Sequence, residues 1–186
     1  MPRVKSPARP LIALPIIFGL SISLGACRLD PTPQEVIDSL GPESGSPGDT
    51  HRPGQPCVVC HGSYGAVSPQ MVFGGTAFTN DEDGNVIPAQ GVEVIVFDSA
   101  GGSRKRCTNA AGNFYLEKEE WKDVAFPLTV KAGSRRMRSL IGRDGSCGSC
   151  HKIPDVDFPE RDPETGAAYD SAGYVLVDPA DQGACQ

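Results

Sequence analysis

The sequence lacks the basic clusters that bind nucleic acid, and it has few segments that could form long helices. Its formal net charge is −6 and it contains no basic stripe, which argues against nucleic acid as a partner. Its 186 residues include 22 glycines and 17 prolines, which disrupt helices but suit turns between strands, so a helical bundle is not expected. Histidine is also scarce, with three residues, and any site that needs imidazole has few candidates. The length fits one compact domain with tails.

The N-terminal segment, residues 1–26, has the pattern of a secretory signal. Arg3, Lys5 and Arg9 precede an apolar stretch over residues 11–24, which is shorter than a typical transmembrane helix. Export would place the rest of the chain in a compartment where disulfides persist. Removal of the signal leaves 14 Lys and Arg residues against 23 Asp and Glu residues, a net charge of −9.

The end of this segment, Leu24-Gly25-Ala26-Cys27, resembles the bacterial lipoprotein box. The resemblance implies cleavage before Cys27 and a diacylglycerol group on its thiol, which would anchor the chain to a membrane. An Asp after the cysteine favours the inner membrane in that family, and Arg28 stands there instead. The resemblance therefore implies the outer membrane of the bacterial cell envelope, on its periplasmic face or at the cell surface. An ordinary secretory signal with a coincidental Cys27 is the alternative.

Residues 27–55 have the composition of a flexible tether. Five prolines stand among glycines and serines, and a segment of this kind buries little apolar surface. Val36, Ile37 and Leu40 would share one face of a short helix that Thr32 could cap.

Two five-residue motifs, Cys57–His61 and Cys147–His151, have the form Cys-x-x-Cys-His. This is the attachment motif of c-type haem. Cysteines three residues apart lie on one side of a helical turn, where each can form a thioether with a haem vinyl group, and the next residue places an imidazole below the iron. The motifs predict two covalent haem c groups, one in residues 56–70 and one in residues 142–186. The predicted thioether residues are Cys57, Cys60, Cys147 and Cys150, and the predicted proximal ligands are His61 and His151.

Two other chemistries use cysteine pairs at this spacing. A structural zinc ion would need both pairs to converge on one point, and a thioredoxin-like redox motif would need a βαβ pattern around one pair. The histidine directly after each pair, in an exported chain, favours haem over zinc. No βαβ pattern surrounds either pair.

The second axial position of each iron has few candidates. Two of the three histidines are proximal ligands, so His51 is the imidazole that is left, and two bis-histidine haems within one chain are excluded. We assign His51 to one haem, with the choice of haem left open, and Met137 to the other. Met137 precedes its motif by ten residues and stands among three arginines, whereas Met71 is a weaker candidate. The alternative is core packing for either methionine and exposure in a tail for His51.

Residues 71–141, between the motifs, predict short strands joined by turns, a pattern typical of an all-β fold. Val92, Val94 and Val96 alternate onto one face of a strand, and Asp81–Asn85 has the composition of a turn.

Several pieces of this segment carry a resemblance to a known family: Gly75-Thr76, Gly84-Asn85, Gly91-Val92-Glu93-Val94, Thr108-Asn109 and Gly112-Asn113-Phe114. Together they resemble the carboxypeptidase-regulatory-like, or transthyretin-like, domain family. The resemblance implies a prealbumin-like Greek-key β-sandwich that serves as a structural or binding module and has no catalytic residues. Irregular or short helical haem-binding segments would flank it at both ends. The whole arrangement resembles small exported cytochromes of bacteria.

The two remaining cysteines, Cys107 and Cys185, are expected to form a disulfide, since the chain is exported. This bond would pin the tail to the strands, and two unpaired thiols are the alternative. The tail is acidic over residues 155–181 and contains one apolar run, Tyr174–Val177, which predicts a final strand. The seven cysteines thus divide into one for lipid, four for haem and two for a disulfide.

These features predict an electron-transfer protein whose two haems exchange single electrons with partners in the cell envelope. The net charge of −9 favours a redox partner that docks through a basic surface. One alternative is a haem enzyme or small-ligand-binding protein with one open iron site, which the shortage of His and Met permits. Another is a structural surface module that carries haem.

Overall fold

The computed structural model describes residues 33–40, 42–43, 47–65, 67–142, 144–151 and 172–185. The predicted signal segment, the predicted lipidation residue Cys27 and residues 155–171 of the predicted acidic tail lie outside these ranges. Within the ranges, no helix combines the length and the apolar character that crossing a membrane requires.

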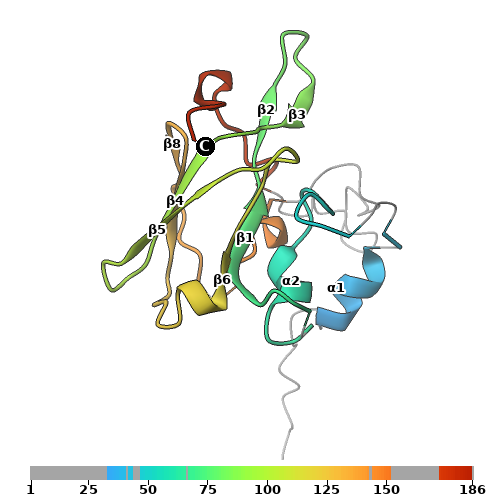
Figure 1. The fold of residues 1–186 in the computed structure, drawn as a ribbon, viewed down its shortest axis with the longest axis vertical. Coiled ribbons are helices and arrows are strands. Elements are labelled where there is room, and N and C mark those ends of the chain that lie inside the picture. Colours follow the sequence, from blue (N-terminus) through green and yellow to red (C-terminus); the bar gives the residue numbers. More distant parts are fainter. Residues whose placement is uncertain are drawn as a thin grey trace, which may run out of the picture. The chain divides into compact units, whose positions relative to one another are not determined.

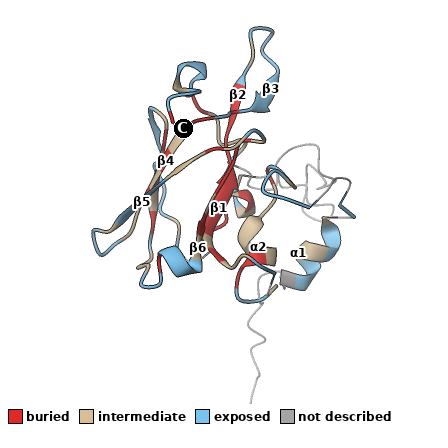
Figure 2. Ribbon diagram, in the orientation of Figure 1, coloured by how far each residue is buried: buried red, intermediate tan, exposed pale blue. Residues whose placement is uncertain are grey.

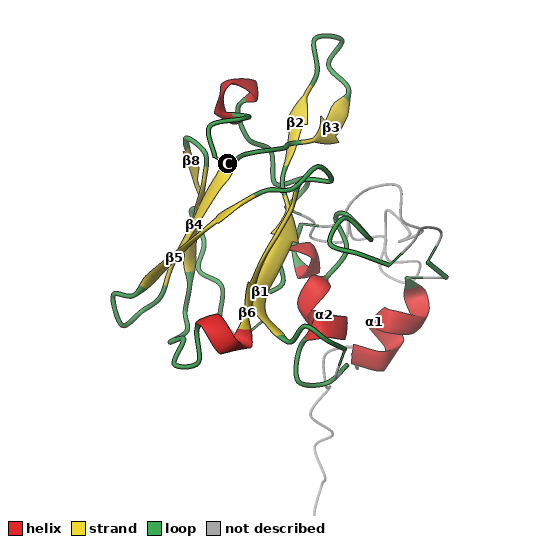
Figure 3. Cartoon of the chain, in the orientation of Figure 1, coloured by secondary structure: helices red, strands yellow, loops and turns green. Residues whose placement is uncertain are grey.

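Short strands make up most of the regular structure, and the helices are short (Figure 1, Figure 3). The helical elements are α1 (Pro33–Ser39), α2 (Cys57–His61), η1 (Lys118–Glu120), η2 (Cys147–Ser149) and η3 (Pro179–Asp181). The strands are β1 (Met71–Thr76), β2 (Phe78–Asn80), β3 (Val86–Pro88), β4 (Glu93–Phe97), β5 (Ser103–Cys107), β6 (Asn113–Glu117), β7 (Thr129–Ala132) and β8 (Arg135–Arg136).

The strands of the described residues form antiparallel sheets. β1 pairs with β6, β2 pairs with β3, and the largest sheet has the order β5-β4-β7-β8. The prediction of an all-β chain with few and short helices is therefore confirmed.

The hydrophobic core is formed by buried residues of both the β1–β6 pair and the four-stranded sheet, and Figure 2 colours the buried positions along the ribbon. Phe73 and Leu116 enter it from the first, and Val94 and Val96 from the second, each at most 2% exposed. The predicted alternation along β4 is confirmed, since Val94 and Val96 are buried whereas Ile95 between them is half-buried. This core supports the segments that carry the two cysteine motifs.

Strand β1 is covered on both faces. Its residues from Phe73 to Thr76 are all buried, whereas a strand with one solvent face shows alternate burial. Phe73 faces the core, and the helical turns α2 and η2 both contact β1. The strand therefore joins the core to both motif segments.

The C-terminal segment runs beside β2. The Phe78 amide donates to the Val175 carbonyl at 2.9 Å, and the Val177 amide donates to the Phe78 carbonyl at 2.8 Å. These bonds form one parallel bridge between Phe78 and Leu176, so the predicted final strand is reduced to a single bridge. Further on, Cys185 forms a disulfide with Cys107, with Cα atoms 5.5 Å apart, which confirms the predicted pairing.

Loss of this disulfide is expected to destabilise the protein. It closes a separation of 78 residues, and the entropy of the unfolded chain predicts a contribution of about 4 kcal/mol to the free energy of unfolding. Urea unfolding of a Cys107→Ser, Cys185→Ser double variant measures this loss. A loss below about 1 kcal/mol would contradict the chain-entropy account.

Candidate functional site

Both cysteine motifs form a single helical turn. The first motif is the whole of α2, and the second begins with η2 and continues through Cys150 to His151. The amide of His151 donates to the carbonyl of Cys147 at 2.8 Å, a bond across four residues that closes the turn. In this conformation the two cysteines of each motif lie on one side of the turn, and the histidine follows directly.

The two motifs, which start 90 residues apart, meet at β1. A methyl group added at Gly74 would lie 3.1 Å from the Cβ of Cys57, and one added at Gly75 would lie 2.5 Å from the Cβ of Cys147. The Gly74 amide also donates to the Gly145 carbonyl at 2.9 Å, which ties the second motif segment to the strand. Adjacent glycines thus receive one cysteine of each motif.

The second motif also packs directly on the chain that leads into the first. A methyl group added at Gly148 would lie 2.7 Å from the carbonyl oxygen of Gln55 and 2.8 Å from the nitrogen of Pro56. Real side chains do not approach backbone atoms this closely, so only glycine fits at position 148 without a shift of one segment. Gly148 therefore lets the two motif segments lie in contact.

Each of the three histidines uses its Nδ1 atom in a bond to a backbone carbonyl. His61 bonds Pro69 at 2.9 Å, His151 bonds Gly173 at 2.8 Å, and His51 bonds Gly48. A carbonyl oxygen only accepts hydrogen bonds, so Nδ1 must carry the proton in each ring. The neutral ring then keeps its lone pair on Nε2, which is the form that binds a metal.

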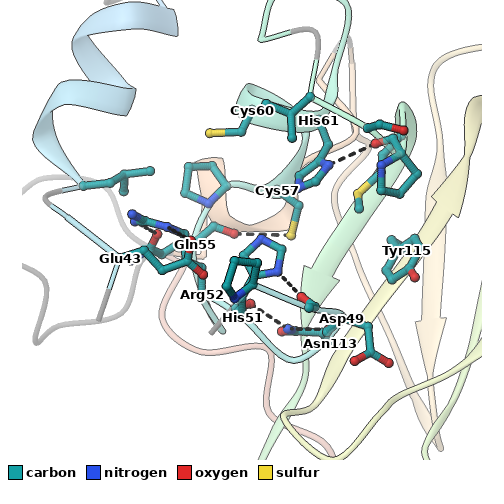
Figure 4. Close-up of a pocket in the computed structure, with 18 of the residues that line it drawn as sticks. Glu43, Asp49, His51, Arg52, Gln55, Cys57, Cys60, His61, Asn113 and Tyr115 are labelled. Carbon is teal, nitrogen blue, oxygen red and sulfur yellow. Dashed lines mark hydrogen bonds and ion pairs between the residues drawn. The ribbon is translucent and has the colours of Figure 1, made fainter. Parts of the chain in front are cut away.

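A cavity of about 400 Å³ opens beside the first motif (Figure 4). His51 and His61 both line it, with their ring centres 5.6 Å apart and their planes tilted by 49°. Cys57 and Cys60 also line it, so the first motif and one further imidazole share the cavity. Much of the remaining wall is apolar, from Leu40, Pro47, Pro56, Val67, Pro69, Met71 and Phe114.

The methionine candidates lie in different places. Met71, at the start of β1, is buried and lines the cavity. Met137 is half-buried and packs against the hydrophobic core, and it is not among the residues that line the cavity. The structure therefore brings His51 and Met71 to the first motif, and Met137 to the core.

Burial suppresses ionisation of one thiol in each motif. Removal from water raises the pKa of Cys57 to about 11, and the same cause raises the pKa of Cys147 further, with a smaller contribution from the nearby Cys57. A redox-active cysteine pair needs a lowered thiol pKa, since the thiolate is the nucleophile. These environments disfavour thioredoxin-like exchange. Within the described part of the chain, no three His, Cys, Asp or Glu side chains form a group that could hold a bare metal ion.

Strand β6 contributes cavity residues that the sequence did not mark as functional. Asn113, Phe114 and Tyr115 line the cavity, and Asn113 is buried although polar. The sequence marks Asn113 only as part of Gly112-Asn113-Phe114, one of the pieces that resemble the carboxypeptidase-regulatory-like family. A polar residue at a buried strand position can indicate a cavity-lining role. The sequence does not show that Asn113 is buried, because its burial depends on residues 47–55, which pack against this end of the strand.

Comparison with known proteins gave no match to a protein-family model, to a curated protein or to a solved structure.

A side chain at position 148 is expected to destabilise the contact between the motif segments. Gly148→Ala should lower the free energy of unfolding by about 1–3 kcal/mol, the usual cost of overpacking. Gly142→Ala is the matched control, because a methyl group there meets nothing within 4 Å. Urea unfolding of both variants measures the difference, and equal stabilities would contradict the packing described for Gly148.

Proposed function

We propose that the chain is a membrane-anchored di-haem c-type cytochrome that transfers single electrons in the bacterial cell envelope. The observation that supports this best is the position of His51. It faces the histidine of a Cys-x-x-Cys-His turn across a cavity that both motif cysteines also line. Neither the motif alone nor the cavity alone would imply an axial pair.

The first site fits a haem in its chemistry. An iron between two imidazoles needs ring centres roughly 6 Å apart, since each metal–nitrogen bond is about 2 Å long. The observed 5.6 Å between the rings of His51 and His61 is close to this separation. Both rings keep Nε2 free for a metal, and the cavity volume lies in the usual range for ligand sites.

The residues of the first site would have different roles in binding the haem. Cys57 and Cys60 would retain the group covalently, and His61 and His51 would hold its metal from two sides. The carbonyls of Pro69 and Gly48 would keep each ring in its orientation and raise the basicity of its ligating nitrogen. The apolar wall would exclude water and so tune the reduction potential. The haem itself would supply the one-electron chemistry.

The second haem would be held by Cys147, Cys150 and His151, next to the first. The bond from His151 to the Gly173 carbonyl leaves its Nε2 in the ligating form, as at the first site. The contact between the motif segments at Gly148 favours direct electron exchange between the two groups. We keep Met137 as the proposed distal ligand of this haem, although its side chain packs against the core.

The same arrangement favours a second candidate function. The chain has three histidines, and His51 lies beside His61, so no further imidazole is left to bind the other side of the haem on His151. An iron without a protein ligand on one side binds small molecules such as carbon monoxide or peroxide. The alternative is therefore a haem enzyme or ligand-binding protein that reacts at the second motif.

The finer fold and the location remain part of the proposal. The strands would form a Greek-key β-sandwich of the carboxypeptidase-regulatory-like type, which would act as the scaffold for both haem segments. A lipid on Cys27 would anchor the chain in the outer membrane. A redox partner with a basic surface would dock on the acidic protein.

The haem content tests this proposal directly. Protein expressed with the c-type maturation machinery should carry two covalent haems by mass spectrometry and by its reduced pyridine spectrum. Cys57→Ser with Cys60→Ser should leave one haem, whereas Cys107→Ser with Cys185→Ser should leave two. Protein without covalent haem would reject the function.

The axial ligands give a second prediction. His51→Ala should convert the first haem from low spin to high spin and let its reduced form bind carbon monoxide, because the sixth position is then open. Met137→Ala should do the same at the second haem if Met137 is its ligand. Optical and electron paramagnetic resonance spectra measure both changes. Carbon monoxide binding by the unmodified protein at one haem would instead favour the ligand-binding alternative.

A further inference from the structure

The segment that carries His51, residues 47–55, contains neither helix nor strand. Its own backbone bonds are few: the His51 amide donates to the Gly48 carbonyl at 3.2 Å, and the Gln55 amide donates to the Arg52 carbonyl at 3.3 Å. Arg52, directly after His51, has a φ of 46°, in the left-handed region that non-glycine residues rarely adopt. Contacts from outside must therefore hold this segment in place.

Several of those contacts come from the ends of β1 and β6. The side-chain amide of Asn113 donates to the carbonyl of His51 at 3.0 Å and to that of Asp49 at 3.2 Å. The hydroxyl of Thr76, the cross-strand partner of Asn113, accepts from the Gly54 amide at 2.6 Å. The strands thus bind the segment before and after Arg52.

The hydroxyl of Thr76 also sets the orientation of the Asn113 amide. It accepts from Gly54, so its own proton is free to donate, and it lies 2.6 Å from Oδ1 of Asn113. Because the hydroxyl of Thr76 donates to Oδ1 of Asn113, the other end of the amide, Nδ2, points toward the carbonyls of Asp49 and His51. Asn113 is 8% exposed, so its amide has little water to bond instead. Both donors of the amide are therefore satisfied only when Asp49 and His51 are in their observed places.

We propose that Asn113 is a positioning residue that holds the axial ligand His51 opposite His61. The inference rests on the proposed function, in which His51 ligates the first haem. Asn113 bonds the backbone of His51 and lines the same cavity, so it acts through the ligand and through the cavity wall. The strands of the sandwich would then complete the haem site and not merely separate the two motifs.

Asn113→Asp tests this role, because aspartate keeps the acceptor for Thr76 and loses both donors to the segment. The matched control is Asn109→Asp, at a neighbouring side chain whose amide bonds Asp49 at 2.6 Å but does not bond His51. Both variants add one negative charge, so a general electrostatic effect is common to both. Thr76→Val, an isosteric change that removes the orienting hydroxyl, is the second variant and guards against misfolding of the first.

The readout is release of His51 in the fully haem-loaded protein, with His51→Ala defining complete release. We expect Asn113→Asp and Thr76→Val to raise the carbon monoxide affinity of the first haem roughly tenfold, the effect of one lost hydrogen bond of ordinary strength, with a loss of the low-spin signal. Asn109→Asp should change the carbon monoxide affinity less than twofold. The urea unfolding midpoints of the variants should be similar.

Equal carbon monoxide affinities for Asn113→Asp and Asn109→Asp would overturn the role of Asn113. They would leave the assignment of His51 as a haem ligand intact. A rise that appears only in proportion to lost unfolding free energy would also overturn it, because the effect would then be general destabilisation. If His51→Ala itself left the spectrum unchanged, the assigned ligation would fail and the role of Asn113 with it.

Discussion

The structure depends on the burial of both faces of strand β1. One face places Phe73 in the hydrophobic core, and the helical turns of both cysteine motifs pack against the strand. The glycines at positions 74 and 75 make this contact feasible, because a side chain at position 75 would collide with Cys147 and one at position 74 would crowd Cys57. The core therefore does more than stabilise the domain, since it fixes the strand on which two distant motifs are assembled.

A second constraint is the repeated bond from a histidine Nδ1 to a backbone carbonyl. It occurs at His51, His61 and His151, with carbonyls from three separate turns or loops. Such a bond selects the tautomer and holds the ring at once, which is the usual preparation of a metal-ligating imidazole. Its presence at all three histidines is consistent with a shared role, and none of these carbonyls lies in a helix or strand.

The segment over residues 47–55 changes the expected organisation of the N-terminal part of the chain. Its composition predicts a tether up to residue 55, yet Gly54, His51 and Asp49 all bond the ends of β1 and β6. Proline and glycine prevent regular structure in such a segment, but they do not prevent side chains elsewhere from binding its carbonyls. Composition reports on the local conformations of a segment and not on the partners of its backbone.

The sequence by itself determined the features that depend on near neighbours along the chain. The motif turns follow from spacings of three and four residues, and the burial along β4 follows from the alternation of Val94 and Val96. The disulfide between Cys107 and Cys185 followed from a count of cysteines in a chain predicted to be exported.

Only the tertiary structure decided which histidine faces which, that the two motifs touch, and that Met137 packs on the core. Each of these is a contact between residues far apart in sequence, set by how the strands pair and pack. No local pattern of residues encodes which distant residues come into contact.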